Sequence, residues 1–92
     1  MLEKVKLALR ITVDAYDTEL LALIEAAKGD LHIAGVDSEL EDNPLLERAI
    51  ITYCRANFGS PADYDKVKAS YDEQKAQLQM ATGYTDWGDL NV

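Results

Sequence analysis

The residues best suited to chemistry in this chain are three carboxylates that flank one tyrosine: Asp14, Asp17 and Glu19. Clustered carboxylates can bind a divalent cation or serve as general acid and base. An oxygen-ligand metal site, however, requires more carboxylates or a glycine-bearing loop with ligands at alternating positions. The alternative is structural, with Asp14 or Asp17 capping a following helix and the other acid in its first turn. We predict the structural role and no metal site.

The other nucleophiles and metal ligands of the sequence have no suitable neighbours. His32 is the only histidine, and no cysteine or second histidine stands at a zinc-binding spacing from it. The serines lie outside any nucleophile elbow, and the glycines are too far apart for a phosphate-binding loop. Cys54 lies in an apolar run, which favours a buried thiol, with a reactive cysteine as the alternative. We therefore predict that the protein is not an enzyme and needs no cofactor.

Composition indicates a single small acidic domain. The chain has 92 residues, of which 48% are hydrophobic, and its net charge is -8. Nine Lys and Arg against seventeen Asp and Glu disfavour binding along a nucleic-acid backbone. No apolar run approaches the ~18 residues of a membrane-spanning helix, and no secretory leader is evident. We expect one domain over residues 1–92 that is made and kept in a cytoplasm, without a membrane partner.

Apolar residues recur at helical spacing through most of the chain. The clearest run is in the second predicted helix, where core positions follow steps of four, three, four and three residues from Leu20 to Ala34. No segment alternates long enough to predict a strand. The predicted fold is all-α, a small four-helix domain with a short first helix, two long core helices and an irregular C-terminal tail. Its elements are helices over about 2–10, 17–34, 44–58 and 61–81, and a tail over 83–92.

Several residues mark the expected helix ends. Asn43 before Pro44 predicts an N-cap followed by proline at the first helical position, and Ser60 before a second proline predicts another. Gly35 and Gly83 are expected to end the second and fourth helices. The helix-cap predictions therefore comprise Asp14, Asp17, Asn43 and Ser60.

Two features predict contact with another protein. The third helix is apolar on most sides and includes Ile51 and Phe58. Its apolar surface is larger than three short neighbouring helices can cover. The tail carries Tyr84 and Trp87 among polar residues. Tyrosine and tryptophan are enriched at protein interfaces, so these two side chains predict contact with a partner protein. The alternative for Trp87 is that it folds back over the small core. These four residues are the candidate protein interface.

Two stretches carry a pattern that extends over nearly the whole chain. The first half contains LRITVDAYDTELLALIEAA, a short helix end, an acidic turn and a leucine-rich helix. The second half contains AIITYCRANFG, then ASYDEQKAQLQM and GYT. Together these stretches resemble the small head-to-tail connector family of tailed bacteriophages, also described as DNA-packaging proteins.

This resemblance implies a non-enzymatic, all-helical structural subunit. Such a subunit assembles as a ring on the portal protein, continues the DNA channel during head completion, and meets tail-side connector proteins. Its place is the head-tail junction of the virion, and before assembly the host bacterial cytoplasm. DNA passes through the channel without specific binding, and an acidic lumen is compatible with this because it repels phosphates.

A second class of function is an acidic helical protein-binding module. A DNA mimic or phage-encoded regulator could occupy the basic site of another protein through the segment VDSELEDN, residues 36–43. Binding of that kind weakens steeply with ionic strength, whereas connector docking weakens much less.

Overall fold

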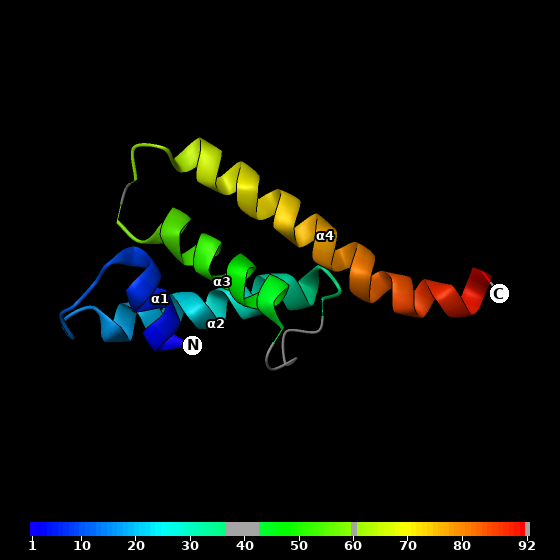
Figure 1. Ribbon diagram of the computed structural model, residues 1–92, viewed down its shortest axis with the longest axis horizontal. Helices are drawn as coiled ribbons and strands as arrows, with labels where there is room; N and C mark the ends of the chain where they lie inside the picture. The colour runs from blue at the N-terminus through cyan, green and yellow to red at the C-terminus, as the bar shows by residue number, and fades with distance from the viewer. Residues whose placement is uncertain (37–42, 60, 92) are drawn as a thin grey trace.

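The computed structural model describes residues 1–36, 43–59 and 61–91, with side chains described as far as Met80. Within these ranges the chain forms four helices and no strand, which confirms the predicted all-α fold. They are α1 (Leu2–Leu9), α2 (Asp17–Ile33), α3 (Pro44–Asn57) and α4 (Tyr64–Asn91). Helices α2, α3 and α4 run in alternating directions, and α1 packs against both α2 and α3 (Figure 1).

Helix α2 is continuous through Gly29 and ends as the sequence predicts, close to Gly35. Gly35 has a positive φ of 89°, a conformation that glycine adopts without steric cost. The Val36 N–H donates to the Leu31 carbonyl at 2.9 Å, and the Gly35 N–H donates to the His32 carbonyl at 3.0 Å. This pair of bonds forms a Schellman turn, which satisfies carbonyls that the helix end would leave unpaired.

The start of α3 confirms the predicted cap. The Asn43 side chain accepts hydrogen bonds from the backbone N–H groups of Leu45 and Leu46 at 3.0 and 3.3 Å. Pro44 occupies the first helical position, where its missing N–H costs nothing. The first three helices each end one residue before the predicted boundary, at Leu9, Ile33 and Asn57.

The prediction for the fourth helix is wrong at both ends. Helix α4 begins at Tyr64, because a turn closed by the Tyr64 N–H and the Pro61 carbonyl precedes it. Its backbone continues past Gly83 to Asn91, where the sequence predicted an irregular tail. Glycine inside a helix costs only about 1 kcal/mol relative to alanine, so Gly83 does not by itself end the helix. The predicted cap Ser60 lies outside the described residues.

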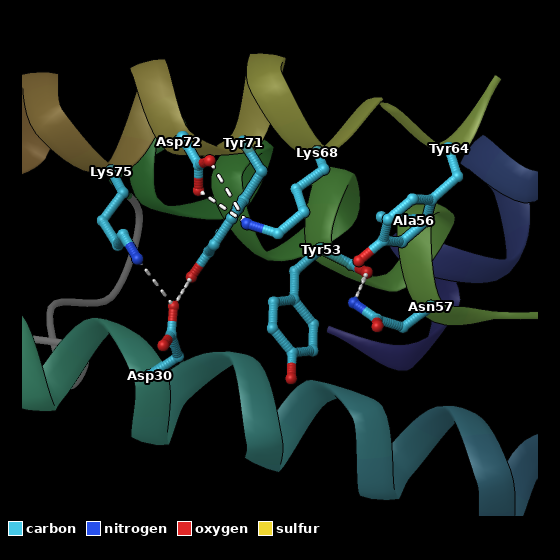
Figure 2. Close-up of a pocket in the computed structure, with 9 residues that line it drawn as sticks. All are labelled: Asp30, Tyr53, Ala56, Asn57, Tyr64, Lys68, Tyr71, Asp72 and Lys75. Atoms are coloured by element: carbon cyan, nitrogen blue, oxygen red, sulfur yellow. Dashed lines mark hydrogen bonds and ion pairs between the residues drawn. The ribbon is translucent and has the colours of Figure 1, made fainter. Parts of the chain in front are cut away.

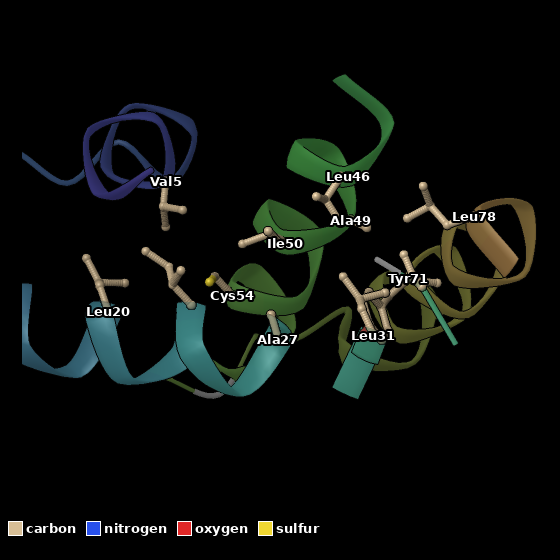
Figure 3. Close-up of a cluster of buried hydrophobic side chains, with 12 residues drawn as sticks. Val5, Leu20, Ala27, Leu31, Leu46, Ala49, Ile50, Cys54, Tyr71 and Leu78 are labelled. Atoms are coloured by element: carbon tan, nitrogen blue, oxygen red, sulfur yellow. The ribbon is translucent and has the colours of Figure 1, made fainter. Parts of the chain in front are cut away.

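The core forms around α3, which contacts each of the other three helices (Figure 3). From α2 come Leu20, Ile24, Ala27 and Leu31, all at most 3% exposed, so the predicted stripe is confirmed. The remaining members of the buried cluster are Val5, Val36, Leu46, Ala49, Ile50, Cys54, Tyr71 and Leu78. Helix α4 contributes Tyr71 and Leu78 to it, which are seven residues apart and therefore lie on one edge of the helix.

Replacing Ile24 by aspartate tests the core directly. Ile24 is 3% exposed, and Ile24→Asp buries an unpaired carboxylate among apolar side chains. We expect a loss of at least about 4 kcal/mol in the free energy of unfolding. Ile24→Val, as the matched control, should cost only about 1 kcal/mol. Circular dichroism during thermal unfolding measures both, and an Ile24→Asp variant that melts like Ile24→Val would contradict the assignment.

Candidate interaction surfaces

The acidic cluster is organised by a lysine from α1. The Lys6 Nζ lies 2.8 Å from Asp17 Oδ1 and 2.9 Å from Asp14 Oδ1, and the Lys6 side chain is only 11% exposed. Hydrogen bonds with Asp17 and then Asp14 raise the pKa of Lys6 above its ordinary value of 10.5. The ammonium therefore stays charged and ties α1 to the start of α2.

The predicted capping by Asp14 and Asp17 is wrong. The N-cap of α2 is Tyr16, and no side chain makes a capping hydrogen bond there. Lys6 attracts both carboxylates instead, while Asp17 and Glu19 remain in the first turn, where the helix dipole favours them. Within the described ranges, no group of three or more His, Cys, Asp or Glu side chains is arranged to hold a metal ion.

A polar cavity of about 230 Å³ lies between α2, α3 and α4 (Figure 2). Its lining includes the Asp30 carboxylate, which accepts hydrogen bonds from the Tyr71 hydroxyl at 2.5 Å and from Lys75 Nζ at 3.3 Å. Nearby, Lys68 pairs with Asp72 along α4 at 3.2 Å. The remaining lining residues are Tyr53, Ala56, Asn57 and Tyr64. Both carboxylates of this cavity are thus already engaged by cations, which makes it a polar joint between α2 and α4.

The charge state of this joint follows from its contacts. The hydrogen bond from Tyr71, assisted by Lys75, holds the pKa of Asp30 below its ordinary value of 3.8. Burial, and then the hydrogen bond to Asp30, raise the pKa of Tyr71. At neutral pH the carboxylate is therefore charged and the hydroxyl keeps its proton, which is the combination the hydrogen bond requires.

Cys54 and His32, the two other candidate chemical groups, lie where the sequence predicts residues without a chemical role. The Cys54 side chain is 0% exposed, and burial raises the pKa of its thiol to about 11. A thiol with this pKa is almost wholly protonated at neutral pH, so it is a poor nucleophile and packs as a small apolar group. His32 is exposed on α2.

The predicted interface residues fall into two groups. Ile51 and Phe58 are half-buried and pack against the core, and the Phe58 ring meets Tyr16 edge-on with centroids 5.3 Å apart. Phe58 therefore joins the end of α3 to the start of α2. Tyr84 and Trp87 belong to the part of α4 beyond the described side chains, so their role in an interface stays a prediction.

The sequence interpretation missed the exposed apolar surface of α2. It expected the excess apolar surface on α3, yet Ile33 of α2 is 86% exposed and Leu21 is 49% exposed. A signal was present, because Ala22, Ala26 and Gly29 precede Ile33 at steps of four, three and four residues. That is helical spacing on the side opposite the core stripe.

These features define a small, acidic, all-helical protein whose exposed apolar side chains suit contact with other proteins. The described helices include none with the length and apolar character needed to cross a membrane. The chain belongs to the phage connector protein family, whose family model matches residues 1–85. It is thus a structural protein of the phage head-tail junction, and the family resemblance is confirmed. Neither the curated proteins nor the solved structures include a significant match.

The Asp30 joint predicts a pH-dependent contribution to stability. Because the pKa of Asp30 is lowered by folding, its carboxylate stabilises the fold above pH 3.8. That stability is lost as the pH falls through the lower folded-state pKa. Asp30→Asn should cost about 1 kcal/mol at neutral pH, a modest figure because solvent screens a side chain that is 38% exposed. The difference from wild type should shrink as the pH falls below 3.8.

Urea unfolding across this pH range measures the effect. Asp72→Asn is a matched control, because it removes the same charge from a carboxylate that pairs with Lys68 within one exposed helix face. It should cost less than Asp30→Asn at neutral pH. An Asp30→Asn penalty that stayed constant down to pH 2 would show that the carboxylate charge does not stabilise the fold.

Proposed function

We propose that this connector protein assembles as a ring on the portal protein and continues the DNA channel during head completion. The observation that carries the proposal is the family match over residues 1–85. A ring needs two different contact patches on each subunit, and the exposed apolar side chains of the helical body supply surface for them. The subunit would act by contact alone. It would reside in the host cytoplasm before assembly and at the head-tail junction of the virion afterwards.

The charge of the chain suits a channel through which DNA slides. With a net charge of -8, a ring of subunits would repel the phosphate backbone, whereas a basic lumen would retain it. The DNA would therefore pass without specific contacts to this protein.

The end of α4 is the part best placed to reach a neighbouring component. Its last turns extend beyond the other three helices, in a molecule that measures 51 × 26 × 18 Å (Figure 1). Tyr84 and Trp87 belong to these turns by sequence. We assign this end to contact with the portal or with a tail-side connector protein.

Co-assembly with the portal protein encoded in the same genome tests the proposal. Native mass spectrometry and negative-stain electron microscopy should find ring-shaped complexes that contain several copies of the chain. If the chain stays monomeric and also does not bind its portal protein, the proposed ring is excluded. Raising the salt from about 0.05 M to about 0.5 M should weaken docking only slightly, while an acidic mimic bound to a basic partner would dissociate.

Trp87→Ala separates docking from folding. If Trp87 contacts a partner, the variant should melt within a few degrees of wild type and bind the portal at least about tenfold more weakly, a typical effect for a central aromatic residue. Trp87→Phe keeps an aromatic ring and should recover part of the binding. Calorimetry and a binding titration measure the two quantities. A large loss of thermal stability would instead place the indole in the core.

A further inference from the structure

Helix α2 presents an unpartnered strip of small side chains to solvent. Ala22, Ala26, Gly29 and Ile33 are all exposed and lie on the side of α2 opposite its buried stripe. A Cβ built on Gly29 meets nothing within 4 Å, so space is open above the strip. These four residues are called here the α2 outer face, or the valley, because the first three carry at most a methyl group. The strip ends in Ile33, which is 86% exposed.

Helix α3 presents a strip of the opposite shape. Leu45, Arg48, Thr52 and Arg55 follow steps of three, four and three residues, on the side turned away from the buried Ile50. Leu45 is 50% exposed and both arginines are exposed. This strip, the α3 outer face, is therefore a ridge that carries three long side chains and one short one.

The ridge is basic although the protein is acidic. Beside it, a hollow of about 290 Å³ is lined by Leu45, Arg48, Gln74 and Gln77, which include no acid. The Arg55 guanidinium donates to the Ala8 carbonyl at 3.5 Å, which places it beside α1. The α2 outer face is flanked instead by the exposed acids Glu19 and Glu25, of which Glu25 also lies 4.0 Å from Lys28 of the same helix.

The two faces point in opposite directions. The buried sides of α2 and α3 face one another across the core, as Leu20, Ile50 and Cys54 illustrate in Figure 3. Their outer faces therefore lie on opposite sides of the subunit. Such an arrangement suits a contact in which one patch of each subunit meets the other patch of the next.

We propose that the α2 outer face of one subunit packs against the α3 outer face of a second copy of this chain. The proposal deepens the ring function proposed above and rests on it, since it names the two surfaces that join neighbouring subunits. The small residues of the valley leave room for the long side chains of the ridge. Ile33 then lies toward the apolar Leu45 end.

Charge and register favour a second copy as the occupant. The contact between Tyr16 and Phe58 sets the antiparallel register of α2 and α3 within one subunit. Three residues after Tyr16 is Glu19, and three residues before Phe58 is Arg55, so these two residues lie at the same level. Nine residues after Tyr16 is Glu25, and nine residues before Phe58 is position 49, so Glu25 lies within one residue of the level of Arg48. A neighbour displaced sideways without a shift along the helices would thus set its two acids against the two arginines.

This register also favours a closed ring. Matching charges at the same level along the helices require no displacement along the assembly axis from one subunit to the next. A heterologous contact without such a displacement closes into a ring when its rotation divides a full turn evenly, whereas one with a displacement along the axis produces a helical filament.

Three substitutions test the contact on the full chain with its portal. Gly29→Leu fills the valley in open space, so the fold should be kept or stabilised while ring assembly weakens at least tenfold. Ala69→Leu, at an exposed site of α4 outside both faces, is the control and should assemble normally. Glu25→Arg and Arg48→Glu should each impair assembly through like charges, and the double variant should recover it.

Native mass spectrometry and thermal unfolding of each variant give the readouts. Loss of rings in Gly29→Leu with an unchanged melting temperature, together with recovery in the double charge variant, is the expected result. If wild type forms rings and these variants form them equally well, the proposed contact is overturned and the ring function stands. If the variants form rings but no longer bind the portal, the α2 outer face binds the portal, and the proposed contact between subunits is overturned. If wild type forms no ring alone or on the portal, both proposals fail.

Discussion

The apolar packing of α3 against all three other helices is the constraint on which the rest of this structure depends. Ala49, Ile50 and Cys54 are nearly inaccessible to solvent, and small side chains at two of these positions let the neighbouring helices approach closely. Once α3 is central, α2 and α4 must flank it and α1 must close one end. The faces left to solvent, and so to other proteins, follow from this arrangement.

Polar contacts then set how the outer helices are oriented about that core. Lys6 fixes α1 to the start of α2 through two carboxylates, and Asp30 fixes α2 to α4 through Tyr71 and Lys75. Asp14 and Asp17, which in the sequence resemble part of a catalytic or metal site, therefore hold helices together. This agrees with the structural role of the phage connector protein family.

The sequence predicts elements better than it predicts the contacts between them. The stripe from Leu20 to Leu31 and the cap at Asn43 were predictable because each depends on residues a few positions apart. The hydrogen bond between Tyr71 and Asp30 joins residues 41 positions apart, and helical periodicity does not say which faces of two helices meet. Lys6 is a similar case, because helical spacing places it on the polar side of α1 and does not indicate that two carboxylates meet it. The predicted helix end at Gly83 was wrong because glycine permits a helix to end but does not force it to.

The length of α4 gives the subunit a mechanical property. Its 28 residues, at 1.5 Å each, make a rod of about 42 Å, most of the 51 Å long dimension of the molecule. One end of this rod is anchored in the core through Val67, Tyr71 and Leu78, and the other end projects beyond the remaining helices. A force applied to the projecting end is thus carried by one continuous helix into the α3 packing.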